Sequence, residues 1–212
     1  MKKVYTVKQL IERLEKLVNT HTVYATGAFG ASIADFPDQL KRYRDNTLKA
    51  CGATEAQKVV NAAKTSPCFA FDCIGMVEAI SAWEFAWDKN SVYGGTKYKA
   101  NGVDEWGASK YGMITHCEDV STDFSKIVPG ELLSLDGHVG IYIGNGMAVE
   151  CTTAWNGNVQ KVECWNVKKT GRGRKWDRHG KMPWIDYSEQ PGPTPEKKSI
   201  TCPCCGAKFV QE

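Results

Sequence analysis

Residues 136–151 have the sequence DGHVGIYIGNGMAVEC. Apolar residues alternate with polar or small ones in both halves, which is the period-two pattern of β-strands. The Gly144-Asn145-Gly146 segment between the halves predicts a reversal of chain direction. The stretch therefore predicts an antiparallel hairpin with one apolar face.

The hydrophobic pattern also predicts which polar residues share the other face of this hairpin. Branched apolar residues cover one face of the first strand, so His138 lies on the opposite face. If the loop has an odd number of residues centred near Gly144, Glu150 lies opposite His138. A two-residue Asn145-Gly146 turn would instead bury the Glu150 carboxylate among apolar side chains, at a cost of several kcal/mol. The pattern therefore favours a pairing of His138 with Glu150.

Helices precede strands in the remainder of the chain. Apolar residues at helical spacing predict helices over residues 6–19, 38–50, 54–64 and 72–87. The glycine-punctuated residues 23–31 predict a loop. Period-two patterns predict strands at Leu132–Leu135, His138–Ile143, Met147–Cys151 and Val159–Trp165. This order predicts an α+β fold with an antiparallel sheet.

The overall composition is that of an ordinary globular protein. With 212 residues, of which 42% are hydrophobic and 24% charged, a fibrous or largely disordered chain is excluded. The net charge of +3 is too small to indicate a nucleic-acid partner. Since no apolar run approaches the roughly 20 residues of a membrane helix, and no apolar signal core is visible, we expect synthesis in the cytoplasm without a signal peptide.

The cysteines raise the question of a nucleophile. Nine cysteines, an odd number, in a chain without a visible signal peptide argue against a disulfide framework. Cys73 begins the predicted helix 72–87, where unpaired backbone N–H groups and the helix dipole favour a thiolate. Such settings lower a thiol pKa from about 8.5 to roughly 3.5–7.5, so we expect a lowered pKa for Cys73. Taken alone, Cys73 is weak evidence for a nucleophile, because a buried structural cysteine is the commoner case.

Cys73, His138 and Glu150 together have the chemistry of a catalytic triad. Cys73 would attack a carbonyl carbon, His138 would act as the base and then as the acid, and Glu150 would fix the imidazole tautomer. The Cys73 backbone N–H at the helix start would stabilise the oxyanion. The alternative for Glu150 is a solvated strand carboxylate.

Two sequence blocks carry a family resemblance. FDCIGM at 71–76 and GHVGIYIGNG at 137–146, with Glu150 placed 12 residues after His138, resemble the NlpC family of papain-like bacterial cell-wall cysteine peptidases. PGELL at 129–133 resembles the segment that leads into the histidine strand of that family. The family usually has Ser at the position after the cysteine and His, Asn or Gln at the third catalytic position, so this chain departs from it at both.

The resemblance implies a fold, an activity and a setting. The implied fold is a papain-like α+β core with the cysteine at a helix N-terminus packed on an antiparallel sheet. The implied activity is hydrolysis of peptidoglycan at an amide bond of the stem peptide, as a γ-D-glutamyl endopeptidase, without metal or other cofactor. The alternatives are an N-acetylmuramoyl-L-alanine amidase, another papain-like acyl chemistry, and a catalytically inactive wall-binding module. The implied setting is that of a phage or prophage lysin, an endolysin that acts on the wall after release.

The resemblance also suggests residues that contact the substrate. Asp72 is implied because the family uses the residue before the cysteine near the substrate amine. Tyr24 is implied because Tyr24 to Gly27 is the nearest likeness to a Tyr-x-x-Gly-Gly segment, although the family has that segment shortly before the cysteine. Tyr142, which shares the predicted face of His138, is a third candidate.

Composition divides the chain into a catalytic domain and a tail. We predict a hydrolase domain at 1–187 with an aromatic insertion at about 88–129, a proline-rich linker at 188–199 and a Cys-rich tail at 200–212. The tail contains a C-x-x-C pair, Cys202 and Cys205. Because structural zinc needs four ligands, this pair could bind zinc only across a dimer or with Cys164 or His179. The alternative is a degenerate tail.

Two aromatic stretches remain open in function. Residues 165–181 interleave basic and aromatic side chains, including Arg174 and Trp176, and could bind an anionic wall polymer or nucleic acid. A solvated strand edge is the commoner arrangement. In the insertion, Tyr98, Trp106 and Tyr111 either line a groove or pack a loop core.

Overall fold

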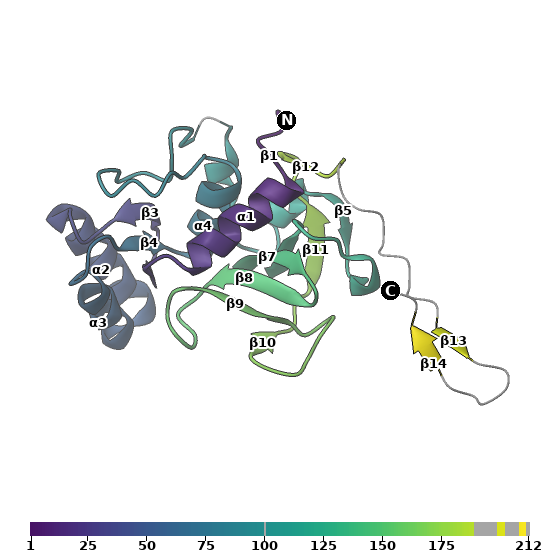
Figure 1. Cartoon of the computed structure of the whole chain (residues 1–212). Helices are drawn as coiled ribbons and strands as arrows, with labels where there is room; N and C mark the ends of the chain where they lie inside the picture. Colours follow the sequence, from purple (N-terminus) through teal and green to yellow (C-terminus); the bar gives the residue numbers. More distant parts are fainter. Residues whose placement is uncertain (100, 189–198, 202–207, 211–212) are drawn as a thin grey trace.

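The computed structural model describes residues 1–99, 101–188, 199–201 and 208–210 (Figure 1). Its helices are α1 Val7–Val18, α2 Pro37–Cys51, α3 Ala53–Ala62 and α4 Cys73–Ser81, with short 3-10 turns η1 Val103–Glu105, η2 Met113–His116 and η3 Phe124–Lys126. Its strands are β1 Tyr5–Thr6, β2 Thr22–Tyr24, β3 Phe29–Ser32, β4 Phe69–Phe71, β5 Glu118–Ser121, β6 Leu132–Leu135, β7 His138–Gly144, β8 Met147–Cys151, β9 Val159–Cys164, β10 Gly173–Arg174, β11 Arg178–Lys181, β12 Ile185–Asp186, β13 Ser199–Thr201 and β14 Lys208–Val210.

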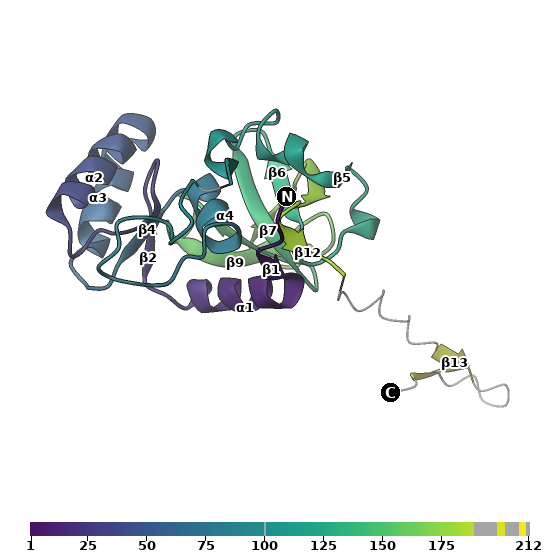
Figure 2. The same cartoon turned by 90° about the horizontal axis from the view of Figure 1, so that it is seen from above.

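The described elements form a mixed α+β structure, which confirms the predicted class. The largest sheet has the strand order β10-β9-β8-β7-β6-β11-β5, and a smaller one has the order β2-β4-β3. Figure 2 shows α2 and α3 at one end of the molecule, the large sheet at the other, and α4 between them. Helix α4 therefore lies at the centre of the fold, against strands β7 and β8 of the large sheet.

Helix α1 follows the pattern that predicted it. Thr6 caps its N-terminus, and the Thr6 and Gln9 side chains each accept a backbone N–H in a reciprocal capping box. Leu10, Leu14 and Leu17 are fully buried on one face of the helix. This face packs toward the sheet and α4 and has no evident role in chemistry.

The predicted helix over residues 72–87 is wrong in its C-terminal half. Helix α4 ends at Ser81, and the chain then adopts left-handed backbone at Glu84 and Trp87, with φ of 61° and 57°. Trp83 remains buried beyond the helix, because the irregular segment folds back over the core. Apolar content alone predicted too long a helix, since buried aromatic residues do not need helical backbone.

The predicted loop over residues 23–31 is also wrong, since it holds strand residues. β2 pairs in parallel with β4, and β3 pairs with β4 from the other side. These strands have only three or four residues, so they are too short to show a period. The turn between β2 and β3 presses on α4 so closely that a Cβ at Gly75 would lie 2.2 Å from the Ala28 carbonyl oxygen.

The hairpin of β7 and β8 has the predicted faces but not the predicted turn. Its loop is the two-residue Asn145-Gly146 turn, with φ of 53° and 72°, which matches a type I′ turn. The expected odd-length loop is therefore wrong. A register shift between Tyr142 and Gly144 adds one residue to β7. The side chains before this bulge therefore point to the same faces that an odd-length loop would have given them. The bulge keeps Glu150 off the face that packs on α4.

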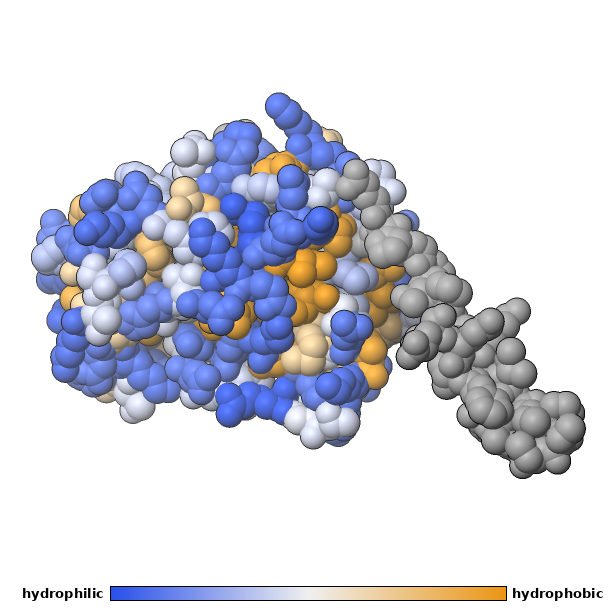
Figure 3. Space-filling model, in the orientation of Figure 1, coloured by the Kyte–Doolittle hydropathy of each residue, from blue (hydrophilic) through white to orange (hydrophobic). Residues whose placement is uncertain are grey.

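The two faces of this sheet supply separate hydrophobic clusters. One cluster joins the sheet to α4 through Val139, Ile141, Val149 and the α4 residues Met76, Val77 and Ile80. The other contains Leu133, Tyr142, Ala148, Val162, Cys164 and Trp176. Hydrophilic residues cover most of the face seen in Figure 3. Among the described residues, no helix is both long and apolar enough to cross a membrane.

Candidate active site

Cys73 is the first residue of α4, and Asp72 caps that helix. The Asp72 carboxylate accepts the Gly75 N–H at 2.8 Å and the Gly27 N–H at 2.7 Å. These two bonds tie the start of α4 to the turn after β2, and they occupy both carboxylate oxygens of Asp72. The Cys73 side chain is largely buried, with 7% of the residue exposed. The helix start is thus held rigidly around the thiol.

Cys73 meets the first residues of β7. The backbone N–H groups of Val139 and Ile74 lie near the Cys73 sulfur and favour its ionised form. Val139 directly follows His138 in the chain. The His138 ring is also close enough to Asp72 to favour the ionised carboxylate electrostatically. The structure therefore places Val139, the residue after the predicted base, beside the predicted thiol, and His138 near Asp72, the residue before that thiol.

His138 is hydrogen-bonded to Glu150, the predicted orienting acid. Its Nε2 lies 2.7 Å from Glu150 Oε2, and the imidazole is 12% exposed while the Glu150 side chain is fully buried. Because an ionised carboxylate only accepts, a neutral imidazole in this bond has its proton on Nε2. Nδ1 then has the lone pair that a general base needs.

Gly140 explains how the two side chains reach each other. Ile141 pairs with Val149, so continuing this register places Glu150 opposite Gly140 and diagonal to His138. A Cβ at Gly140 would lie 2.9 Å from the Trp176 ring and 3.0 Å from the Val149 carbonyl oxygen. The Trp176 ring stacks on the His138 imidazole at a centroid distance of 5.5 Å and an interplanar angle of 13°. Glycine is therefore needed at this position for Trp176 to cover the site.

Arg174 and Trp176 belong to this site, although the sequence indicated only a basic, aromatic stretch around them. Arg174 Nε lies 2.8 Å from Glu150 Oε2, the same oxygen that His138 contacts. Trp176 is 1% exposed and packs beneath the imidazole. Alternation of basic and aromatic residues in this stretch was the only signal, and it does not indicate a partner 24 residues away in the chain.

Tyr24, a predicted substrate contact, lies beside the thiol. It pairs with Phe71 across β2 and β4, which places its ring near Cys73 and Asp72. Burial and the nearby Cys73 and Asp72 raise the pKa of the Tyr24 hydroxyl, so this hydroxyl remains a hydrogen-bond donor. Tyr24, which was predicted from its likeness to a tyrosine segment of the family, therefore lies next to the candidate nucleophile Cys73.

Tyr142, the third predicted contact, does not line the site. Its side chain is 5% exposed within the second hydrophobic cluster. Its hydroxyl accepts the Gly146 N–H at 3.1 Å and so braces the turn of the hairpin. This placement indicates a structural role and does not favour contact with a substrate.

The predicted lowering of the Cys73 pKa is contradicted. Burial, aided by the Asp72 carboxylate, raises the pKa of the Cys73 thiol to about 12, and the nearby backbone N–H groups only partly oppose this rise. Burial also raises the pKa of Asp72 itself, against the N–H groups of Gly75 and Gly27. Local sequence indicated the helix dipole but not the loss of solvent around the sulfur. In the resting site the thiol is therefore protonated.

The zinc prediction cannot be placed on the structure. Cys202 and Cys205 lie outside the described residues, as does most of the predicted linker. His179, one proposed fourth ligand, has both ring nitrogens bonded, Nδ1 to Glu131 at 2.5 Å and Nε2 to the Asp123 carbonyl at 3.1 Å. Within the described part of the chain, no group of three or more His, Cys, Asp and Glu side chains could hold a metal ion.

The aromatic insertion packs on the core with two of its three singled-out rings. Tyr98 stacks on Phe29 at 4.8 Å, and Trp106 stacks on His116 at 3.9 Å, whereas Tyr111 is 77% exposed. Tyr98 and Trp106 therefore stabilise the loop, and Tyr111 is the one that faces solvent.

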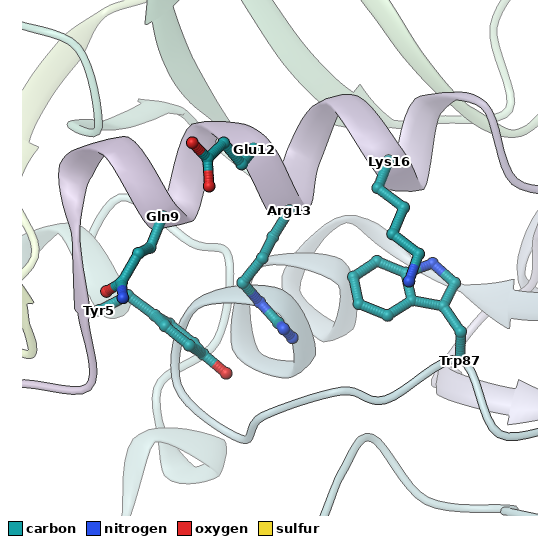
Figure 4. Close-up of a pocket in the computed structure, with 6 residues that line it drawn as sticks. All are labelled: Tyr5, Gln9, Glu12, Arg13, Lys16 and Trp87. Atoms are coloured by element: carbon teal, nitrogen blue, oxygen red, sulfur yellow. The ribbon is translucent and has the colours of Figure 1, made fainter.

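A separate groove lies along α1. Figure 4 shows Arg13 and Lys16 of α1 beside Trp87. The Arg13 guanidinium donates to the carbonyls of Ile80 and Phe85 at 3.1 and 2.6 Å, and Lys16 Nζ lies 4.0 Å from the Trp87 ring centroid. Arg13 thus holds α1 to the end of α4, and the groove is a packing feature.

No protein-family model matches the chain, and no curated protein matches it. The geometry around Cys73 and His138 and the two sequence blocks are therefore the basis for proposing a function.

Proposed function

We propose that this chain is a cysteine hydrolase that cleaves an amide bond in the stem peptide of peptidoglycan, as a γ-D-glutamyl endopeptidase of the NlpC type with a papain-like core. The observation that carries the proposal is the 2.7 Å contact between His138 and Glu150, at the point where the next residue of β7, Val139, lies beside the Cys73 sulfur. The resemblance of the two sequence blocks to the NlpC family supports the substrate class.

The raised pKa of Cys73 favours general-base catalysis over a preformed ion pair. When the substrate is bound, His138 Nδ1 takes the thiol proton while the sulfur attacks the carbonyl carbon. The carbonyl π electrons move to oxygen, and the Cys73 backbone N–H stabilises that negative charge. The imidazolium then gives its proton to the leaving amine as the C–N bond breaks, which leaves a thioester on Cys73.

Hydrolysis of the thioester repeats these steps with water. His138 removes a proton from water as the water oxygen attacks the thioester carbon. The C–S bond breaks, and the imidazolium returns its proton to the Cys73 sulfur. Throughout, Glu150 accepts the Nε2–H bond, which keeps Nδ1 directed at the reacting atoms and stabilises the imidazolium.

Two neighbours of Cys73 have distinct parts in this scheme. Asp72 uses both oxygens on backbone N–H groups, so it acts by fixing the helix start and the oxyanion donor. Tyr24 is partly exposed beside the thiol, and its hydroxyl is the polar group that would contact the substrate backbone.

The direct test is incubation of the purified protein with peptidoglycan and assay of new free amines. We expect amine release by the wild type, none above background by Cys73→Ser, and normal release by Cys51→Ser, a matched change at an exposed cysteine. Mass spectrometry of the fragments distinguishes a γ-D-glutamyl cut from the muramoyl–L-alanine cut of an amidase. Binding of peptidoglycan by the wild type without any release would indicate a wall-binding module, and equal release by Cys73→Ser would remove the thiol from the mechanism.

A further inference from the structure

Glu150 has an unusual electrostatic setting for an orienting acid. Its side chain is fully buried, and one oxygen, Oε2, contacts both His138 at 2.7 Å and Arg174 at 2.8 Å. The other oxygen, Oε1, is buried without a hydrogen-bond partner among the described residues. A buried carboxylate stays ionised only with a close positive charge, because losing hydration costs several kcal/mol. Either the imidazolium or the guanidinium must therefore supply that charge.

We propose that Arg174 is a positioning residue that gives Glu150 a permanent counter-charge, so that His138 rests as the neutral base. This inference rests on the proposed function of Cys73 and His138 and adds a fourth residue to it. Arginine is always charged, whereas histidine is charged only below its own titration range. With Arg174 in place, the carboxylate does not require a protonated imidazole in the resting site.

Aromatic rings and strand pairing hold Arg174 in its position beside Glu150. Its guanidinium lies 5.2 Å from the Trp155 ring centroid and 5.8 Å from that of Trp176. Its Nη2 donates to the Thr152 hydroxyl at 3.4 Å. The backbone of Arg174 pairs in parallel with Cys164 of β9. The guanidinium therefore has few alternative positions away from Glu150.

Other titratable groups surround the His138–Glu150 pair. Asp72 lies ahead of α4 and Cys73 on it, while Cys151 of β8 is close to both Glu150 and Cys73. Burial raises the pKa of both cysteines, so they remain uncharged near neutral pH. Burial likewise raises the pKa of Asp72, and a charge there would favour the imidazolium. Arg174 is the permanent cation that opposes a second positive charge on His138.

The consequence of removing the guanidinium follows from this charge balance. In Arg174→Met the imidazolium becomes the remaining counter-ion of Glu150, so His138 holds its proton to higher pH. The acidic limb of the activity profile should then move up by about one pH unit, the size of shift that one nearby charge produces. The turnover number at pH 6 should fall about tenfold, with little change in KM.

The test compares Arg174→Met, Arg174→Lys and the control Arg172→Met. Arg172 also lies over Trp155, at 5.8 Å, so it shares the aromatic contact. The pH at which the His138 ring signal changes is followed by NMR without substrate, with assignment by a His138→Gln variant. We expect the transition to move up in Arg174→Met and to stay in place in Arg174→Lys and Arg172→Met.

The NMR readout separates this inference from the proposed function. An upward move in Arg174→Met with rescue by lysine supports the charge role, even if the wild type does not cleave peptidoglycan. An unchanged transition in folded Arg174→Met overturns the inference, even if the wild type is an active hydrolase. A similar move in Arg172→Met would also overturn it, because the effect would then not depend on contact with Glu150.

Discussion

The described part of the chain contains two pairs of histidine and glutamate in which the carboxylate is buried, and only one of them has the properties of an active site. His138 Nε2 contacts Glu150 at 2.7 Å, and His179 Nδ1 contacts Glu131 at 2.5 Å. A cysteine lies near each pair, Cys73 near the first and Cys117 near the second. A set of Cys, His and Glu is therefore not by itself an indication of catalysis.

The two imidazoles differ in whether their second ring nitrogen is available to accept a proton. The second ring nitrogen of His179 is bonded to the Asp123 carbonyl, and the ring is buried against Phe124. Cys117 donates its thiol to the Met113 carbonyl at 3.6 Å in the short turn η2. His138, in contrast, is partly exposed, and its pair lies where a helix N-terminus meets a strand. His138 is therefore the candidate base, because its Nδ1 has a lone pair to accept a proton and the residue lies near the start of a helix.

The largest contrast between the two pairs should appear in activity. His138→Ala removes the base and should lower amine release from peptidoglycan by roughly 10³-fold or more, by analogy with triads. Circular dichroism should show a folded protein, since the imidazole is at the edge of the packed core. His179→Ala, assayed at a temperature where it remains folded, should retain activity within a few-fold. Equal losses of amine release in His138→Ala and His179→Ala would show that the two pairs do not differ in catalytic role.

Thiol reactivity sharpens the comparison from the cysteine side. Burial raises the pKa of Cys73 and of Cys117 to about 12 each, so neither thiol is ionised at pH 7. The alkylation rate of Cys73 should therefore rise about tenfold per pH unit from pH 7 to 10, as the thiolate fraction grows. Peptide mass spectrometry in a Cys51→Ser background measures this rate. If the alkylation rate instead reaches a plateau below pH 7, the pKa of Cys73 is lowered, as the sequence predicted.

Stability should show the opposite order of the two pairs. His179→Ala leaves the Glu131 carboxylate buried without its imidazole, which should cost about 3–5 kcal/mol of unfolding free energy. Urea denaturation followed by tryptophan fluorescence measures this loss. The matched change His138→Ala should cost less than half as much, because Arg174 still neutralises Glu150. A larger loss for His138→Ala would contradict the structural role given to the His179 pair.

A smaller effect tests the packing around His138. In Gly140→Ala the new Cβ would press on Trp176, which should cost about 1–3 kcal/mol and displace the ring stacked on His138. Gly107→Ala is the control, since an added Cβ there meets nothing within 4 Å. We expect a reduced turnover number and a lower urea midpoint for the first variant only. Wild-type behaviour of Gly140→Ala would show that the ring stack does not position the imidazole.

The candidate triad could be proposed from the sequence because its signals are local or periodic. The start of α4 follows from the change in pattern at Cys73, and the face shared by His138 and Glu150 follows from the alternation of apolar residues in β7 and β8. The cost of burying a carboxylate did not keep Glu150 in solvent, since its side chain is fully buried on that face. The turn was wrong because a bulge in β7 compensates for a two-residue loop, and a bulge has no signature in the alternation of side chains.

The missed features depend on contacts that are remote in the chain. Arg174 reaches Glu150 only because β10 pairs in parallel with β9, and a two-residue strand has no detectable period. The raised pKa of Cys73 depends on burial of the thiol in the folded chain, which the sequence around Cys73 does not show. The C-terminal half of the predicted helix 72–87 failed because buried aromatic side chains suit a loop as well as a helix.

The proposal that Cys73 is the nucleophile is tested most directly by a search for the thioester on its sulfur. The protein is mixed with a synthetic stem peptide, quenched in acid, and analysed by intact-mass and peptide mass spectrometry. The account predicts an added mass equal to the acyl half of the peptide, carried by Cys73 and lost in Cys73→Ser. Turnover of the peptide with no acyl mass on Cys73, and with undiminished turnover by Cys73→Ser, would contradict it.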